Sequence, residues 1–186
     1  RDRIRSSPYL RLALGLVVVL GAVIVAQVIV TSLPLSRLPS RILLTVVTVA
    51  SAVGAYAWFF RWAEARQITE LSGDTLARET GVGMLIGALM FGFCVAVLAA
   101  LGTFRIAGIN PWSVLLIPLI INVGSAVFEE VLFRGVLFRL LEEGVGTWLA
   151  LLASALLFGG LHLINENATL MGAVGVGLEA GFALAA

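Results

Sequence analysis

The sequence predicts an all-α membrane protein, a polytopic bundle of about six transmembrane helices. Of its 186 residues, 60% are hydrophobic and only 12% are charged, against roughly 25% charged residues in soluble domains. Uncharged runs of 19 to 25 residues recur along the chain, and about 20 apolar residues suffice to cross a bilayer. Each run is expected to be a helix, because a lone strand leaves its backbone groups unsatisfied in lipid. This composition excludes soluble, disordered and disulfide-rich classes, and a net charge of +1 gives no field for nucleic acid.

The charges divide the chain into the expected spans. These cover residues 12–33, 42–60, 82–103, 112–141, 147–164 and 168–186. The fourth span is longer than a bilayer needs, and its second half is charged. We expect two parts: residues 1–79, with two spans and a cytoplasmic connection, and residues 80–186, a second helix bundle. The polar segment 61–80 is taken as the connection, and its charges are expected to form a solvated face.

Arginine placement predicts the orientation, since cytoplasmic loops of membrane proteins are enriched in basic residues. With a cytoplasmic N-terminus, nine arginines flank the spans inside and three lie outside. The inner set is Arg1, Arg3, Arg5, Arg11, Arg61, Arg66, Arg78, Arg134 and Arg139, and the outer set is Arg37, Arg41 and Arg105. The N-terminus is therefore expected to be cytoplasmic.

Ionisable groups concentrate in the fourth span, where charge at membrane depth is costly and indicates function. Glu130 and Arg134 are four residues apart, so they share a helix face and can pair. The adjacent Glu129 points about 100° away and stays outside that pair. Asn122, Ser125 and Glu129 are spaced three and four residues apart, as a polar stripe on an apolar helix. Such a stripe would line a wet cavity or contact another polar helix, although charge at a helix end is also often merely interfacial.

The fifth span carries His162, the only histidine, after Phe158-Gly159-Gly160. Glycines there let a neighbouring backbone or a substrate approach closely. His162 and Glu129 lie on consecutive antiparallel spans and can meet at one depth, where a carboxylate and a neutral imidazole could deprotonate water. They could also bind zinc, but zinc sites usually need three or four protein ligands. A lone histidine in an apolar helix is, in turn, commonly structural.

Other features of the spans support packing or exclude other protease chemistries. The spacings Gly83-x-x-x-Gly87 and Gly177-x-x-x-Gly181 allow close helix contact. Glu179 lies within the last span, where it would face a cavity or pair with an arginine. There is no His-Glu-x-x-His or Gly-x-Ser-x-Gly sequence, and the only aspartates, Asp2 and Asp74, lie outside the spans. Zincin, serine-elbow and aspartyl-dyad mechanisms are therefore not indicated.

Taken together, these motifs resemble the CPBP family of intramembrane proteases. The family comprises CAAX prenyl proteases and bacteriocin-processing enzymes, also called abortive-infection (Abi) proteins. Glu129-Glu130-x-x-x-Arg134 is followed, on the next span, by Phe158-x-x-x-His162, and His162 comes 28 positions after Arg134. The order, spacing and membrane setting carry the resemblance, which covers roughly residues 80–186.

The resemblance implies an intramembrane endopeptidase in the bacterial cell membrane, acting on a prenylated or membrane-associated peptide. The resemblance to the family motifs implies that Glu129 activates the attacking water and that His162 helps to hold it. Glu130 and Arg134 order the site, Phe158 lines it, and the polar side chains of Asn122 and Ser125 are taken as contributing to substrate binding. Metal dependence is disputed for the family, so zinc on Glu129 and His162 stays an open assignment.

This sequence departs from the family pattern in one respect. The family has a later His-x-x-x-Asn motif, which is absent from these 186 residues. We expect that the chain stops short of it, so that these residues alone would be impaired as an enzyme. The alternative function is a non-catalytic bacteriocin-immunity or membrane scaffold protein. A small transporter ranks third, because no pair of broken helices is visible.

Overall fold

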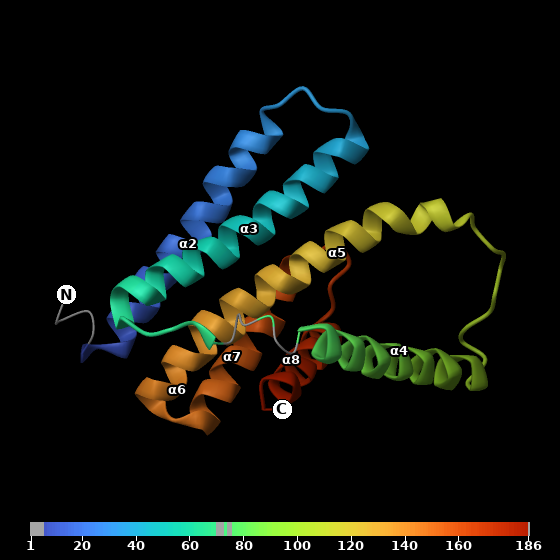
Figure 1. Cartoon of the computed structure of the whole chain (residues 1–186). Coiled ribbons are helices and arrows are strands. Elements are labelled where there is room, and N and C mark those ends of the chain that lie inside the picture. Colours follow the sequence, from blue (N-terminus) through green and yellow to red (C-terminus); the bar gives the residue numbers. More distant parts are fainter. Residues whose placement is uncertain (1–5, 70–72, 74–75, 186) are drawn as a thin grey trace. The chain divides into compact units, whose positions relative to one another are not determined.

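A computed structural model describes residues 6–69, 73 and 76–185. All regular secondary structure in these residues is helical, which confirms the predicted fold class (Figure 1). The α-helices are α2 (Pro8–Thr31), α3 (Arg37–Glu64), α4 (Leu76–Ala100), α5 (Leu116–Glu129), α6 (Arg139–Val145), α7 (Thr147–Leu161) and α8 (Leu170–Ala185). The other elements are the 3₁₀ turns η2 (Trp112–Leu115) and η4 (His162–Ile164) and the π-helix η3 (Glu130–Phe138).

Five helical segments within the described residues are long and apolar enough to cross a membrane. They are Pro8–Thr31, Arg37–Glu64, Ala77–Ala100, Trp112–Val145 and Thr147–Ile164. The sixth predicted span forms α8, whose 16 residues extend about 24 Å, less than the ~30 Å hydrocarbon core. The prediction of about six spans thus resolves into five of sufficient length and one shorter apolar helix. Arg1, Arg3 and Arg5, used for the orientation, lie outside the described residues.

The chain divides into two compact units by its internal contacts. One consists of residues up to Arg66 together with residues from Leu116 onward, and the other is Gln67–Leu115. The second unit contains α4 and η2. In the first, the α2–α3 hairpin packs directly on the helices that carry the two glutamates. The contacts group the α2–α3 hairpin with the helices after Leu116. The expected boundary between residues 79 and 80 stays a prediction.

The first unit is held together at the end where α2 begins and α3 ends. α2 and α3 lie side by side (Figure 1), and between them Gln27 Nε2 donates to Thr48 Oγ1 at 3.1 Å. Near the end of α3, the rings of Phe59 and Phe60 are almost completely buried. A Cβ at Gly15 of α2 would lie 3.2 Å from Val136 Cγ1, so α2 approaches η3 closely there. This aromatic core fixes the helix that carries the candidate site against the hairpin.

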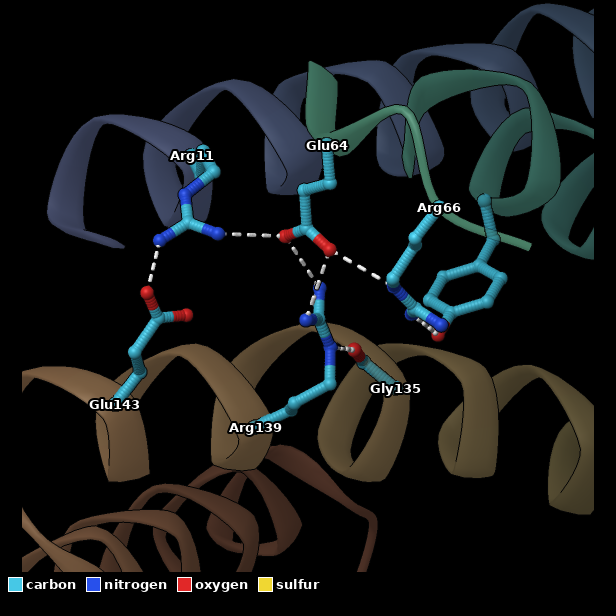
Figure 2. Close-up of polar contacts among 7 residues, drawn as sticks. Arg11, Glu64, Arg66, Gly135, Arg139 and Glu143 are labelled. Atoms are coloured by element: carbon cyan, nitrogen blue, oxygen red, sulfur yellow. Dashed lines mark hydrogen bonds and ion pairs between the residues drawn. The ribbon is translucent and has the colours of Figure 1, made fainter. Parts of the chain in front are cut away.

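Charged residues surround the same core and form what we call the Glu64 cluster. Its members are Arg11, Glu64, Arg66, Arg139 and Glu143 (Figure 2). The Glu64 side chain is only 9% exposed and accepts bonds from three guanidinium groups at 2.8 to 3.1 Å. The expectation that the charges of segment 61–80 form a solvated face is therefore wrong for Glu64. Buried charges persist where they are paired and hydrogen-bonded, as here.

Candidate active site

The two adjacent glutamates lie where the long fourth segment changes its helical form. Glu129 is the last residue of α5, and Glu130 is the first residue of the π-helix η3. The predicted span over residues 112–141 is helical throughout, and its helical form changes at this point. Glu129 follows Trp112 by 17 residues and precedes Val145 by 16, so it lies near the middle of this candidate span. π-helical turns are rare and are frequently found at functional sites.

The two glutamates differ in their hydrogen bonding, as the spacing predicted. Glu130 pairs with Arg134 at 2.9 Å, which confirms the expected four-residue contact. Glu129 is half-buried and has no hydrogen bond or ion pair with any other described residue. It lies within electrostatic range of His162 and Glu130. A half-buried carboxylate without a donor keeps its lone pairs for water or substrate.

The histidine lies at the point where α7 ends. α7 extends to Leu161, and His162 caps it and begins the 3₁₀ turn η4. His162 Nδ1 lies 2.8 Å from the carbonyl oxygen of Phe158. Because a carbonyl only accepts, Nδ1 carries the proton in this contact, and Nε2 of the neutral ring keeps its lone pair. The second nitrogen is therefore the one suited to hold a water or accept a proton.

Aromatic rings connect the helix of the glutamates to the helix of the histidine. Phe133 of η3 meets Phe158 of α7 edge to face, with ring centroids 4.8 Å apart. Phe158 in turn packs on the His162 ring at 4.6 Å. Phe158 was predicted to line the site, whereas Phe133 was not singled out from the sequence. Its spacing of four residues after Glu129, which places both on one side of the helix, was the available signal.

A cleft of about 150 Å³ lies between these elements. Its lining consists of Ala126, Glu129, Glu130, Phe133, Arg134, Phe158 and Ala180. The structure thus brings both glutamates, Arg134 and Phe158 together, with α8 contributing Ala180. Asn122 and Ser125 do not line this cleft and are exposed on α5. Ser125 lies about one turn before Glu129, and Asn122 about two turns before it. Their substrate-binding role stays a prediction.

Glycines set the close packing of α7 against α8 beside the cleft. A Cβ at Gly159 would lie 2.4 Å from the Ala173 carbonyl oxygen, and one at Gly177 would lie 2.9 Å from the Ala155 carbonyl oxygen. The predicted close approach is confirmed at both positions. Gly83 and Gly87 lie on α4, in the other unit, and a packing role for that motif stays a prediction.

The side chain of Glu179 has neither of the two environments expected for it. Glu179 is exposed on α8, has no ion pair with a described residue and does not line the cleft. Its neighbour Ala180 contributes to the cleft lining instead. The carboxylates that face the cleft are therefore Glu129 and Glu130.

The described residues do not fit a complete protein-ligated zinc site. Glu129 and His162 have suitable donor atoms, but zinc usually takes at least three protein ligands. No group of three or more His, Cys, Asp or Glu side chains able to hold a metal occurs among the residues that the structure describes. Glu129 and His162 together therefore supply at most two ligands to a metal ion.

Comparison with known proteins supports the resemblance found in the motifs. Residues 110–186 match the family model described as Rce1-like, type II CAAX prenyl endopeptidase. This range includes both glutamates, Arg134, Phe158 and His162. The family model and the motif resemblance therefore agree over this part of the chain. No curated protein and no solved structure gave a match.

Proposed function

From the match of residues 110–186 to the type II CAAX prenyl endopeptidase family, we propose that this protein is an intramembrane endopeptidase with Glu129 as its general base. The observation that supports this most strongly is the environment of Glu129. It is a half-buried carboxylate without a hydrogen-bond donor among the described residues, in a cleft near the middle of a candidate span. A carboxylate held there without a partner is costly, and ionisable groups at such depth mark functional sites.

The proposed reaction is hydrolysis of a peptide bond by an activated water. Glu129 accepts a proton from the water as the water oxygen bonds to the peptide carbonyl carbon. His162 Nε2, oriented by the Nδ1 bond to Phe158, accepts a hydrogen bond from the other O–H of the same water. The proton on Glu129 then passes to the leaving amide nitrogen as the C–N bond breaks, giving a carboxyl and an amine product. General base catalysis of this kind contributes about 10²- to 10⁴-fold in rate.

The remaining cleft residues are assigned to ordering the site and receiving the substrate. The ion pair of Glu130 with Arg134 neutralises a second charge close to Glu129. Phe133 and Phe158 supply an apolar wall at the depth of the glutamates. This lining suits a membrane-associated or prenylated peptide, the substrate that the family description names.

The test measures peptide cleavage by the full-length protein in proteoliposomes, with a prenylated peptide carrying a fluorophore and a quencher. Glu129→Gln and His162→Ala are expected to lower kcat by at least about 100-fold. Glu179→Gln is the matched control, because it removes another carboxylate from an apolar helix that does not line the cleft. That control is expected to cleave within about twofold of the wild type.

The outcomes separate the proposal from the alternative of a non-catalytic binding protein. Membrane insertion and thermal unfolding of Glu129→Gln are expected to match the wild type, since Glu129 loses no described hydrogen bond. Cleavage retained by Glu129→Gln would overturn its assigned role. A wild-type protein that binds the peptide without cutting it would favour the binding protein.

A further inference from the structure

One residue, Arg139, bonds to the end of the π-helix with both its backbone and its side chain. Its backbone N–H donates to the Val136 carbonyl. Its side-chain Nε donates to the Gly135 carbonyl at 3.2 Å. The helix continues from η3 directly into α6, so the side-chain bond is an added donor on a carbonyl of the last π-helical turn, and it restrains that turn. Arg139 therefore bonds twice to the last turn of the segment that begins with Glu130.

The guanidinium group of Arg139 is itself fixed by α3. Its Nη1 and Nη2 donate to the two carboxylate oxygens of Glu64 at 3.1 and 3.0 Å, in the bidentate arrangement seen in Figure 2. Its central carbon lies 4.4 Å from the centroid of the buried Phe60 ring. A planar fork paired on two oxygens and stacked on a ring has little freedom to move. The Gly135 carbonyl is thus tied to α3 through one rigid side chain.

The two sides of the π-helix differ in how tightly they are held. On the side facing the hairpin, Val136 and Leu140 are fully buried, and a Cβ at Gly135 would lie 2.9 Å from Tyr56 Cε2. On the cleft side, the side chains of Glu130 and Arg134 are 57% and 50% exposed. The packing that determines the helical form of residues 130–138 therefore comes from the hairpin side, and the cleft side chains follow it.

We propose that Arg139, anchored by Glu64, is a positioning residue that holds the π-helix and thereby sets Glu129, Glu130 and Arg134 in the cleft. This inference rests on the proposed function only where its test measures peptide cleavage. Arg139 acts from a distance of ten residues along the helix from Glu129 and does not line the cleft. Displacement of reacting groups by about 1 Å can cost about 100-fold in rate, so a loosened π-helix has a measurable effect.

The experiment compares Arg139→Gln and Arg139→Lys with the wild type in two assays. The first is cleavage of the quenched prenylated peptide, analysed as kcat and KM. The second is hydrogen–deuterium exchange of the peptide covering residues 130–138, which needs no activity. Both variants are expected to lower kcat by about tenfold or more at unchanged KM, and to speed exchange in this segment. Lysine keeps a positive charge for Glu64 but cannot form the planar fork that also reaches Gly135.

Arg11→Gln is the matched control, because Arg11 also binds Glu64 but connects it to a different place. Arg11 Nη1 donates to Glu64 at 2.8 Å, and its Nη2 bonds to Glu143 of α6, eight residues beyond Gly135. Its loss is expected to lower thermal stability like the loss of Arg139. It is expected to leave kcat and the exchange of residues 130–138 within about twofold of the wild type, at temperatures where each variant is folded.

The two assays distinguish failure of this inference from failure of the proposed function. Should Arg139→Lys match the wild type in both kcat and exchange, the positioning role is overturned, and Arg139 only stabilises the fold. Equal losses of kcat in Arg11→Gln and Arg139→Lys would overturn it as well. If the wild type cleaves no peptide, the proposed function fails. In that case, exchange of residues 130–138 that is faster in Arg139→Lys but not in Arg11→Gln still supports the inference that Arg139 restrains the π-helix.

Discussion

The Glu64 cluster and the cleft both combine carboxylates with arginines, and both use residues of the segment Trp112–Val145, but they are built in opposite ways. Glu64 is 9% exposed and is bonded by three guanidinium groups from three parts of the chain. In the cleft, Glu130 has a local partner four residues away, and both side chains are at least half exposed. Glu129 has no hydrogen bond to any other described residue.

This difference separates a carboxylate that holds the fold from one that is available for chemistry. A carboxylate whose lone pairs are taken by fixed donors stabilises the packing of the elements that supply those donors. A carboxylate left without donors can accept a proton from water. The saturated group lies at the end of the helices, and the unsaturated one lies near the middle of a candidate span. Rigid support at the helix ends thus accompanies an open site near the middle of the span.

The largest effect is expected from Glu64→Gln, which removes the carboxylate at the centre of the Glu64 cluster. The substitution leaves the guanidinium groups of Arg11, Arg66 and Arg139 close together without their shared negative charge. We expect the free energy of unfolding to fall by about 3–5 kcal/mol, as for other buried pairs that lose one partner. Denaturant titration of the protein in detergent micelles measures it. Glu166→Gln, in an exposed loop, serves as the control, and a loss below about 1 kcal/mol for Glu64→Gln would contradict the anchoring role.

A smaller effect is expected from Gly135→Ala, which tests the contact between the π-helix and α3. The new methyl group would lie 2.9 Å from Cε2 of Tyr56, a ring that is 2% exposed and cannot move aside freely. Overpacking of this kind costs about 1–3 kcal/mol, against a gain of up to about 1 kcal/mol from the helix preference of alanine. Unfolding in the same denaturant titration is therefore expected to become easier.

Gly54→Ala on α3 is the matched control for that substitution. No described atom lies within 4 Å of a Cβ at Gly54, so only the helix preference should act there. This variant is expected to be as stable as the wild type or slightly more stable. Equal stability of Gly135→Ala and Gly54→Ala would show that Tyr56 yields and that the contact does not hold the π-helix.

The all-helical fold and the pairing of Glu130 with Arg134 could be predicted, because both depend on local sequence. Uncharged runs locate helices in a membrane protein, and a four-residue spacing brings two side chains together on almost any helical turn. The freedom of Glu129 from that pair followed from the same geometry. The motif order also indicated that the helices of Glu129 and His162 would lie close together, and Phe133 and Phe158 make contact between them.

The Glu64 cluster and the π-helix could not be predicted, because both depend on partners far apart in the chain. Nothing near Glu64 in the sequence indicates that Arg11 and Arg139 would reach it, at separations of 53 and 75 residues. A polar stretch between apolar runs is usually solvated, and that general expectation failed for Glu64. The π-helix likewise begins in a stretch whose spacing fits an ordinary α-helix. A contact such as that between Gly135 and Tyr56 becomes visible only in three dimensions.

The smallest effect is expected from Glu130→Gln, which asks whether the cleft is open to water. Its ion pair with Arg134 is exposed on both sides, and exposed pairs of this spacing contribute about 0.3–0.5 kcal/mol in water. If water fills the cleft, as a hydrolytic site requires, the free energy of unfolding should change by no more than that. An Arg134 side chain that faces lipid without the charge of Glu130 would instead cost about 2.5 kcal/mol or more. Denaturant titration of Glu130→Gln beside the double variant Glu130→Gln/Arg134→Gln separates the two cases, because removing Arg134 restores stability only where lipid surrounds it.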